Sequence, residues 1–310
     1  MLSKINSFGI FGIEAFPVEI EVDISAGLPT INIVGLADTS VKESKERIRA
    51  AIKNSGFSFP PHRITVNLAP ADTKKEGALF DLPIALSILA SSKQINPDCL
   101  QHYIFLGELS LQGTLRPIKG ALPIAIKAAR HNINNILLPL ANAKEAALIK
   151  EVNVFGAQTI KEVIHMLTNT VPPEPIQTSL HMNCMKHQYY TEDFSDVKGQ
   201  FMAKRALEVA VAGVHNILLI GPPGSGKSML AKRIPTIMPD MREEELIETT
   251  CIHSSLGIVP PEGLVIARPF RSPHHTTSDI DVAQWTGILR DLHVLYPDSL
   301  KYRHSTVYLN

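Results

Sequence analysis

Apolar and polar positions along the first 168 residues follow short periods that predict a domain of mixed α and β structure. From Val18 to Val22 every second residue is aliphatic and the residues between are glutamates, which is typical of a half-buried strand. Elsewhere the apolar residues form short runs or recur at the spacing of a helix face. The expected strands cover residues 18–22, 30–34, 63–68, 103–106, 136–138 and 152–155. The expected helices cover residues 38–56, 81–91, 122–130, 143–149 and 159–167.

Polar residues and glycines mark the ends of several of these helices. Asn142 is expected to cap the helix 143–149 with its side chain. Thr159 and Glu162 have the spacing of a capping box at the start of the next helix. Gly56 stands where a C′ glycine would end the first helix. These signals support the helix assignments.

The pattern changes after residue 168. Residues 168–185 contain three prolines and little periodicity, which predicts a linker and a domain boundary. We therefore expect an N-terminal domain at residues 1–168, a linker at 169–190, a second domain at 191–279 and a divergent tail at 280–310. The elements expected in the second domain are a helix at 200–213, a strand at 216–220, a helix at 227–234 ended by Pro235, and a helix at 243–250.

A glycine-rich loop in the second domain matches the pattern GxxxxGK[ST]. Its glycines let successive backbone N–H groups point at phosphate oxygens, and the following helix adds its positive end. Lys227 would place its charge on the β- and γ-phosphates, and Ser228 would ligate Mg²⁺. We therefore predict that ATP and Mg²⁺ bind at a site formed by Gly221, Pro222, Pro223, Gly224, Ser225, Gly226, Lys227 and Ser228.

An ordinary glycine- and proline-rich turn is the alternative explanation of this loop. The bare pattern can occur by chance, but a phosphate-binding loop follows a strand and opens a helix. The apolar run Ile217–Ile220 precedes the loop, and Met229, Leu230 and Ile234 follow it at helical spacing. This context favours the phosphate-binding loop.

Composition narrows the classes of partner and compartment. The chain has 30 basic and 30 acidic residues, so its overall charge does not indicate nucleic-acid or membrane binding. Cys99, Cys184 and Cys251 form no CxxC pair, which excludes the common zinc and redox motifs and fits reduced thiols in the cytosol. The N-terminus lacks the apolar core of a signal peptide, and no apolar run approaches the ~20 residues of a membrane helix. We expect a cytoplasmic protein without a membrane partner.

Several separate motifs resemble the ComM/YifB family of magnesium-chelatase-like AAA+ ATPases and occur in the same order. The second domain contributes DVKGQ at 196–200, the loop GPPGSGKS at 221–228 and RPFRSPHH at 268–275. The first domain contributes GLAD at 35–38, VNLAPAD at 66–72 and FDLP at 80–83. The resemblance covers roughly residues 1–279.

This resemblance implies a fold and a function. The fold would be α/β, with an N-terminal Lon-protease-like α+β domain (ribosomal S5 domain 2-like) followed by a partial P-loop AAA+ α/β domain. The AAA+ module of this family forms rings, usually hexamers, and hydrolyses ATP. The resemblance therefore implies that the chain assembles with itself. ComM-type proteins act on DNA during natural transformation and promote branch migration, so DNA would be a partner.

The N-terminal domain is not expected to be a peptidase. Lon-type peptidases use a serine nucleophile activated by a lysine of depressed pKa. When Glu76-Gly77 is matched to their Asp-Gly, the serine position falls on Leu79, and the lysine position falls on Leu122. Neither side chain can attack or exchange a proton, so no catalytic residue is assigned. Four nearby residues could in principle substitute for the missing serine and lysine, namely Lys74, Lys75, Ser87 and Lys119. We interpret them instead as solvated loop charges and a helix serine.

A basic cluster near the end of the resemblance has two interpretations. Arg268, Arg271, His274 and His275 could contact DNA phosphates or a ring pore. They could equally belong to a structural loop held by prolines. Phe270 offers the cluster one aromatic side chain for stacking on bases.

The family pattern stops after residue 279. The family continues to a strand ending in Leu-Asp-Glu, which holds Mg²⁺ and orients the attacking water. The nearest segment here, residues 292–298, has a histidine within its apolar run, a proline before its aspartate, and Ser299 where a glutamate is needed. Hydrolysis should therefore suffer more than nucleotide binding. A truncated or frame-shifted product and a short paralogue with its own tail both fit the sequence.

Four functions remain in competition at this stage. The leading one is an ATP-binding protein of the ComM/YifB type that is deficient in hydrolysis. A second is a non-catalytic nucleotide-binding or assembly protein, which the absence of the Leu-Asp-Glu strand would favour. An ATP-dependent protease is disfavoured by Leu79 and Leu122. A magnesium chelatase subunit rests on AAA+ similarity alone.

Overall fold

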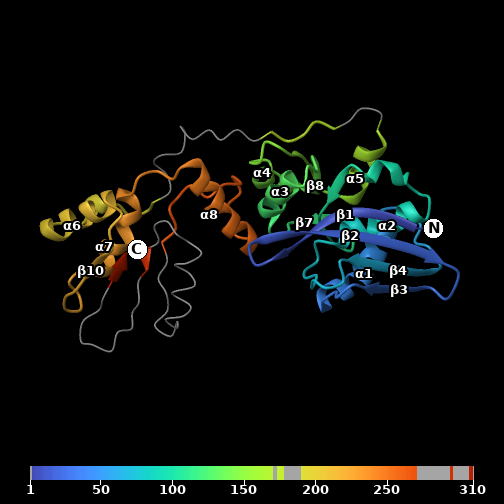
Figure 1. Cartoon of the computed structure of the whole chain (residues 1–310), viewed down its shortest axis with the longest axis horizontal. Helices are drawn as coiled ribbons and strands as arrows, with labels where there is room; N and C mark the ends of the chain where they lie inside the picture. Colours follow the sequence, from blue (N-terminus) through green and yellow to red (C-terminus); the bar gives the residue numbers. More distant parts are fainter. Residues whose placement is uncertain (1, 170–172, 178–189, 271–293, 296–306, 310) are drawn as a thin grey trace. The chain divides into compact units, whose positions relative to one another are not determined.

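The computed structural model describes residues 2–169, 173–177, 190–270, 294–295 and 307–309. By packing, the chain divides into two units (Figure 1). The first unit joins residues 1–180 to residues 244–265, and the second joins residues 181–243 to residues 266–310. Residues 244–265 therefore pack with the N-terminal part of the chain, although they follow the linker in sequence.

A seven-stranded mixed sheet forms the centre of the first unit, in the order β3-β4-β2-β1-β5-β8-β9. β1–β2 and β2–β4 are antiparallel, whereas the other neighbouring pairs are parallel. The predicted mixture of helices and strands is confirmed. The strands are β1 Leu2–Phe11, β2 Glu14–Ser25, β3 Thr30–Val34, β4 Arg63–Ala69, β5 Tyr103–Phe105, β8 Asn135–Pro139 and β9 Asn153–Ala157, and a separate pair is β6 Glu108–Leu109 with β7 Leu115–Arg116.

The helices between residues 39 and 168 contribute apolar side chains to the core on this sheet. Asp38 caps the first helix, since its Oδ1 accepts from the backbone N–H of Val41 at 2.8 Å. The second helix is buried along its whole length, which its almost entirely apolar sequence explains. The helices are α1 Thr39–Asn54, α2 Asp81–Ser91, α3 Ala121–Arg130, α4 Leu140–Ala146, α5 Ile160–Thr168 and α8 Glu243–Leu256, with a 3₁₀ turn at Pro97–Leu100.

Strand β1 was not predicted, because polar residues occupy two of its inward positions. It pairs with β2 along its full length. Ser3 and Ser7 lie buried among apolar neighbours, where their hydroxyls donate to the carbonyl oxygens of Ser87 at 2.8 Å and Phe105 at 2.9 Å. Hydrogen bonding thus allows serine at positions that a hydropathy pattern reserves for aliphatic residues.

Of the two side-chain caps expected at α4 and α5, the first is wrong and the second is confirmed in part. The helix α4 begins at Leu140, so Asn142 lies inside it and the predicted cap is wrong. The Asn142 side chain instead accepts from the N–H of Ile118 and donates to the carbonyl oxygen of Ile118, both at 2.9 Å. Thr159 does cap α5, but Glu162 accepts from the N–H of Gln158 and not from that of Thr159.

The second unit contains the glycine-rich loop. Its small apolar core includes Phe194, Val197, Leu207, Leu230 and Ile234. A three-stranded sheet in the order β10-β12-β11 lies beside it. The elements are a 3₁₀ turn at Phe194–Asp196, α6 Phe201–Ala212, β10 Ile217–Leu219, α7 Lys227–Arg233, a 3₁₀ turn at Ile234–Ile237, β11 Val294–Leu295 and β12 Val307–Leu309.

None of the helices that the structure describes combines the length and the apolar character that crossing a bilayer requires.

Candidate functional site

The glycine-rich loop connects β10 to α7, so it lies between a strand and a helix (Figure 1). Gly224 and Gly226 have φ angles of +81° and +86°, a region that favours glycine. A hydrogen bond forms within the loop, since the N–H of Ser225 donates to the carbonyl oxygen of Pro222 at 3.3 Å. The chain therefore makes a tight turn just before the first residue of α7, Lys227.

Lys227 folds back into the curve of the loop and is only 8% exposed. Its Nζ donates to the carbonyl oxygens of Gly221 at 2.9 Å and Pro222 at 2.8 Å, and to Oγ of Ser225 at 3.1 Å. All three acceptors are neutral. A phosphate oxygen carries negative charge and would be a stronger partner for the ammonium group.

Gln200 also contacts the loop, although the sequence did not lead us to assign it to the site. Its Nε2 donates to the carbonyl oxygen of Ser225 at 3.1 Å. Gln200 precedes α6 with a φ of +54°. The signal was present, since Gln200 ends the DVKGQ segment at 196–200. A local reading of the loop could not show that the two segments meet.

A metal ion at this site would depend on the nucleotide. Ser228 follows Lys227 in α7 and is half-buried, so its hydroxyl is the protein ligand that the loop offers. Among the described residues, no group of three or more histidine, cysteine, aspartate or glutamate side chains could hold a metal ion. Mg²⁺ keeps several waters and is usually bound by few side chains plus substrate phosphates, which fits this arrangement.

The strand next to β10 comes from the divergent tail. β12 pairs with β10 in antiparallel register, with Ile217 opposite Leu309 and Leu219 opposite Val307. In the segment 292–298, which was compared with the family's strand ending in Leu-Asp-Glu, only Val294–Leu295 is described, as β11. Asp298 and Ser299 lie outside the described residues.

The positions compared with a peptidase dyad are embedded in the first unit. Leu79 is 8% exposed and Leu122 is fully buried. Lys75 was expected to be a solvated charge, and that expectation is wrong. It is buried, and its Nζ donates to the carbonyl oxygens of Pro70 and Thr73. Burial lowers the pKa of Lys75. Ser87 Oγ has no hydrogen-bond partner among the described residues, so no base contacts it there.

The other two lysines near these positions face solvent. Lys74 forms an exposed ion pair with Glu76 at 2.6 Å, and Lys119 is exposed. Neither is arranged as the base of a nucleophile.

Arg268 has a structural role within the second unit. It is 8% exposed, and its Nε donates to the carbonyl oxygen of Pro239 at 2.7 Å. A second guanidinium nitrogen donates to the carbonyl oxygen of Asp240 at 3.5 Å, and the Arg268 N–H donates to Oη of Tyr190 at 3.0 Å. For Arg268 the geometry favours the structural interpretation of the basic cluster. Arg271, His274 and His275 lie outside the described residues.

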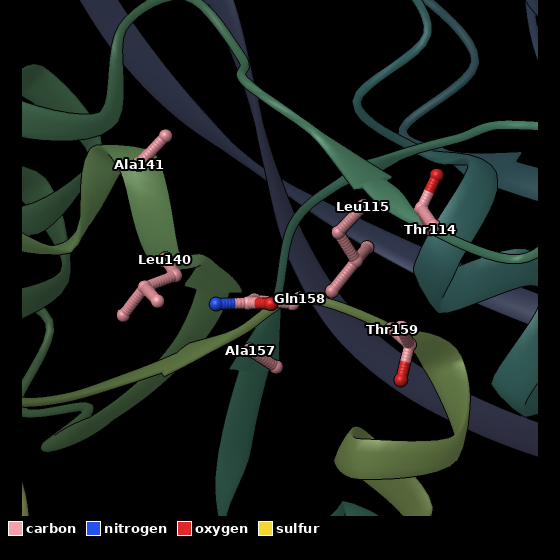
Figure 2. A pocket seen from close by; sticks show the side chains of 7 residues that line it. All are labelled: Thr114, Leu115, Leu140, Ala141, Ala157, Gln158 and Thr159. Atoms are coloured by element: carbon pink, nitrogen blue, oxygen red, sulfur yellow. The ribbon is translucent and has the colours of Figure 1, made fainter.

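A pocket of about 480 Å³ lies in the first unit, where β8 and β9 end. The Gln158 side chain extends across it toward Leu140, whereas the Thr159 hydroxyl points away (Figure 2). It offers no cation to a phosphate, so it is not an alternative nucleotide site. The lining residues are Thr114, Leu115, Leu140, Ala141, Ala157, Gln158 and Thr159.

Comparison with known proteins agrees with the two parts of the chain. Residues 20–142 match the family model for subunit ChlI of Mg-chelatase, and residues 193–284 match the model for magnesium chelatase, subunit ChlI. YifB of Salmonella typhimurium is 43% identical over 277 residues, which are 89% of this chain and 54% of the relative. The competence protein ComM of Haemophilus influenzae is 42% identical over 279 residues, with the same shares covered.

More distant similarity reaches the Lon proteases. Lon protease 2 of Bacillus subtilis is 24% identical over 200 residues, which are 58% of this chain and 35% of the relative. The chain spans about half the length of the YifB and ComM relatives that it matches.

Proposed function

We propose that this chain, which belongs to the magnesium-chelatase-like family that includes YifB and ComM, binds ATP with Mg²⁺ at the loop 221–228. The observation that carries the proposal is the position of Lys227. Its buried ammonium group is held inside the loop by three neutral acceptors. The β- and γ-phosphates would replace those acceptors, and Ser228 with the phosphate oxygens would hold Mg²⁺.

Replacing Lys227 tests the proposal. Lys227→Ala should abolish binding of a fluorescent ATP analogue, because the charge that meets the phosphates is lost. Lys232→Ala is the matched control, since Lys232 lies in the same helix but is exposed. Equal affinity of the Lys227→Ala variant and the unaltered chain would refute the site.

We further propose that the chain binds ATP without efficient hydrolysis. Phosphoryl transfer depends on positioned charges, and the family carries an aspartate and a glutamate at the end of a further strand. No match to that segment occurs between residues 280 and 310. ATP turnover should therefore stay at the level of the Lys227→Ala variant. Turnover that exceeds this level and requires Lys227 would mean that another acid supplies the missing function.

The family relationship also supports a proposal about partners. The chain would assemble with itself through its AAA+ part and act on DNA in the cytoplasm, as a protein of the ComM type in natural transformation. Light scattering with ATP and binding to a labelled branched DNA measure the two activities. If the chain stays monomeric and does not bind DNA at any ATP concentration, a nucleotide-binding role without action on DNA is favoured.

For the N-terminal part we propose a Lon-like fold that lacks peptidase chemistry and serves interaction or assembly. Its support is the pair of buried leucines, Leu79 and Leu122, at the positions compared with the dyad. The purified chain should not cleave casein. Cleavage that is lost on replacing Ser87 or Lys75 would revive the peptidase.

A further inference from the structure

Residues 241–267, here called the strap, begin and end beside one side chain. Within the second unit, the Arg268 guanidinium binds the carbonyl oxygens of Pro239 and Asp240. Those two residues precede the strap and Arg268 follows it. Arg268 therefore links the two ends of the strap by hydrogen bonds, here called the clasp, where the chain leaves the second unit and returns to it.

The body of the strap is a helix and a returning arm that are fastened together. The helix α8 (orange in Figure 1) is the outgoing arm. On the returning arm, the N–H of Val265 donates to Oγ1 of Thr250 at 3.0 Å. Thr250, Leu246, Ser254 and Val265 are all buried within the first unit. The strap is therefore a packed element and not a loose connection.

Ser254 completes the first turn of α3, which lacks a cap of its own. The N-cap position of α3 is Gly120, which has no side chain to accept a hydrogen bond. The carbonyl oxygen of Ser254 accepts from the N–H of Gly120 at 2.8 Å, and its Oγ accepts from the N–H of Leu122 at 3.3 Å. A residue of the strap thus supplies the acceptors that the N-terminal sequence omits.

The returning arm touches the backbone of α4 directly. A Cβ atom on Gly263 would lie 2.8 Å from Cβ of Lys144 and 2.9 Å from the backbone nitrogen of Glu145. Lys144 Nζ also donates to the carbonyl oxygen of Pro261 at 3.4 Å. A close approach of two backbones is specific, because any side chain at Gly263 would force them apart.

Glu145 of α4 lies beneath the docked strap. It is 4% exposed, and its Oε1 accepts from Nδ2 of Asn142 at 2.6 Å. Burial raises the pKa of Glu145, whereas its side-chain interactions with Asn142 and Ser254 act in the opposite direction. The strap residue that caps α3 therefore also meets a buried carboxyl group of α4.

We propose that the strap couples two sets of contacts. The hydrogen bonds of Arg268 in the second unit favour the docking of Ser254 on the first turn of α3. The coupling needs no nucleotide, so it stands or falls separately from the ATP site. Loosening the clasp allows the strap to leave α3 more often. The amide hydrogens of Gly120 and Leu122 then become accessible to solvent together.

Hydrogen exchange of the full chain, resolved to single amides by fragmentation mass spectrometry, tests this coupling. Arg268→Ala should speed exchange at Gly120 and Leu122 by a similar factor, at least about fivefold, because the two hydrogen bonds of the guanidinium group are lost. Arg205→Ala, which removes an exposed arginine from α6 in the same unit, should change neither amide. Unchanged exchange at both amides in a folded Arg268→Ala variant would overturn the coupling.

A serine pair separates loss of the cap from release of the strap. Ser254→Ala removes only the hydroxyl, so Leu122 should exchange about fivefold faster while Gly120 keeps its carbonyl partner. Ser255→Ala is the control, because the Ser255 hydroxyl donates within α8 to the carbonyl oxygen of Cys251. Equal exchange at Leu122 in both variants would overturn the role of Ser254.

A glycine pair decides the question if Arg268→Ala fails to fold. Gly263→Ala pushes the strap from α4, and it should speed exchange at Gly120 and Leu122. Gly56→Ala has the same backbone cost, since φ is +82° at Gly56 and +83° at Gly263, but nothing lies within 4 Å of its added Cβ. The same exchange rates at the two amides in both variants would overturn the proposal.

Discussion

Asp81 begins helix α2 in an environment where two opposing forces act on its carboxylate. Arg47 of α1 donates from Nε to Oδ2 at 2.8 Å and from a terminal nitrogen to Oδ1 at 3.2 Å. The N–H of Leu109 donates to Oδ2 at 3.2 Å. The Asp81 side chain is only 1% exposed. Burial outweighs these favourable partners and raises the pKa of Asp81 to about 6 from an ordinary value of 3.8.

The sign of the resulting pH dependence follows from that shift. The folded state binds the Asp81 proton more tightly than the unfolded chain does. Its contribution to stability is therefore fully present below about pH 4 and is lost as the pH rises through about 6. A shift of about two pKa units corresponds to about 3 kcal/mol. Above pH 7 the contribution no longer changes.

The variant Asp81→Asn isolates this effect, because an amide does not titrate. Urea unfolding followed by circular dichroism gives the free energy of unfolding of both chains at several pH values. The variant should gain about 3 kcal/mol relative to the unaltered chain between pH 4 and pH 7. Asp98→Asn removes an exposed carboxyl and serves as control. A relative change of the opposite sign would show that Arg47 dominates and would refute the reasoning.

Three further outcomes are expected. Burial and the nearby carboxylates of Glu145 and Glu248 raise the pKa of Cys251 to about 12, so iodoacetamide at pH 8 should label it far more slowly than a free cysteine, by peptide mass spectrometry. Equal labelling rates would contradict the raised pKa of this half-buried thiol. Saturating ATP with Mg²⁺, at about 100 times Kd, should stabilise the second unit by about 2.7 kcal/mol in thermal unfolding, and a similar gain in Lys227→Ala would count against the site. Ser7→Ala should cost about 1 kcal/mol in urea unfolding, and no loss would show that its bond to Phe105 adds nothing.

The sequence by itself determined the features that depend on neighbours along the chain. The start of α1 near Asp38 and the strand–loop–helix order around Lys227 were predicted, because helix starts and glycine-rich turns are set within a few residues. Helix α2 was predicted to the residue, since its apolar run has no polar break. The family relationship was likewise visible in short motifs.

Only the tertiary structure decided the features that join distant segments. The strand β1 is stabilised by serine hydroxyls that find carbonyl partners more than eighty residues away. Helix α3 receives its cap from Ser254, 132 positions later, so its start shows no capping residue. Arg268 read as one member of a basic cluster until its partners at Pro239 and Asp240 were seen. A hydrogen-bond donor or acceptor in the sequence does not name its partner, and only the folded chain brings the two together.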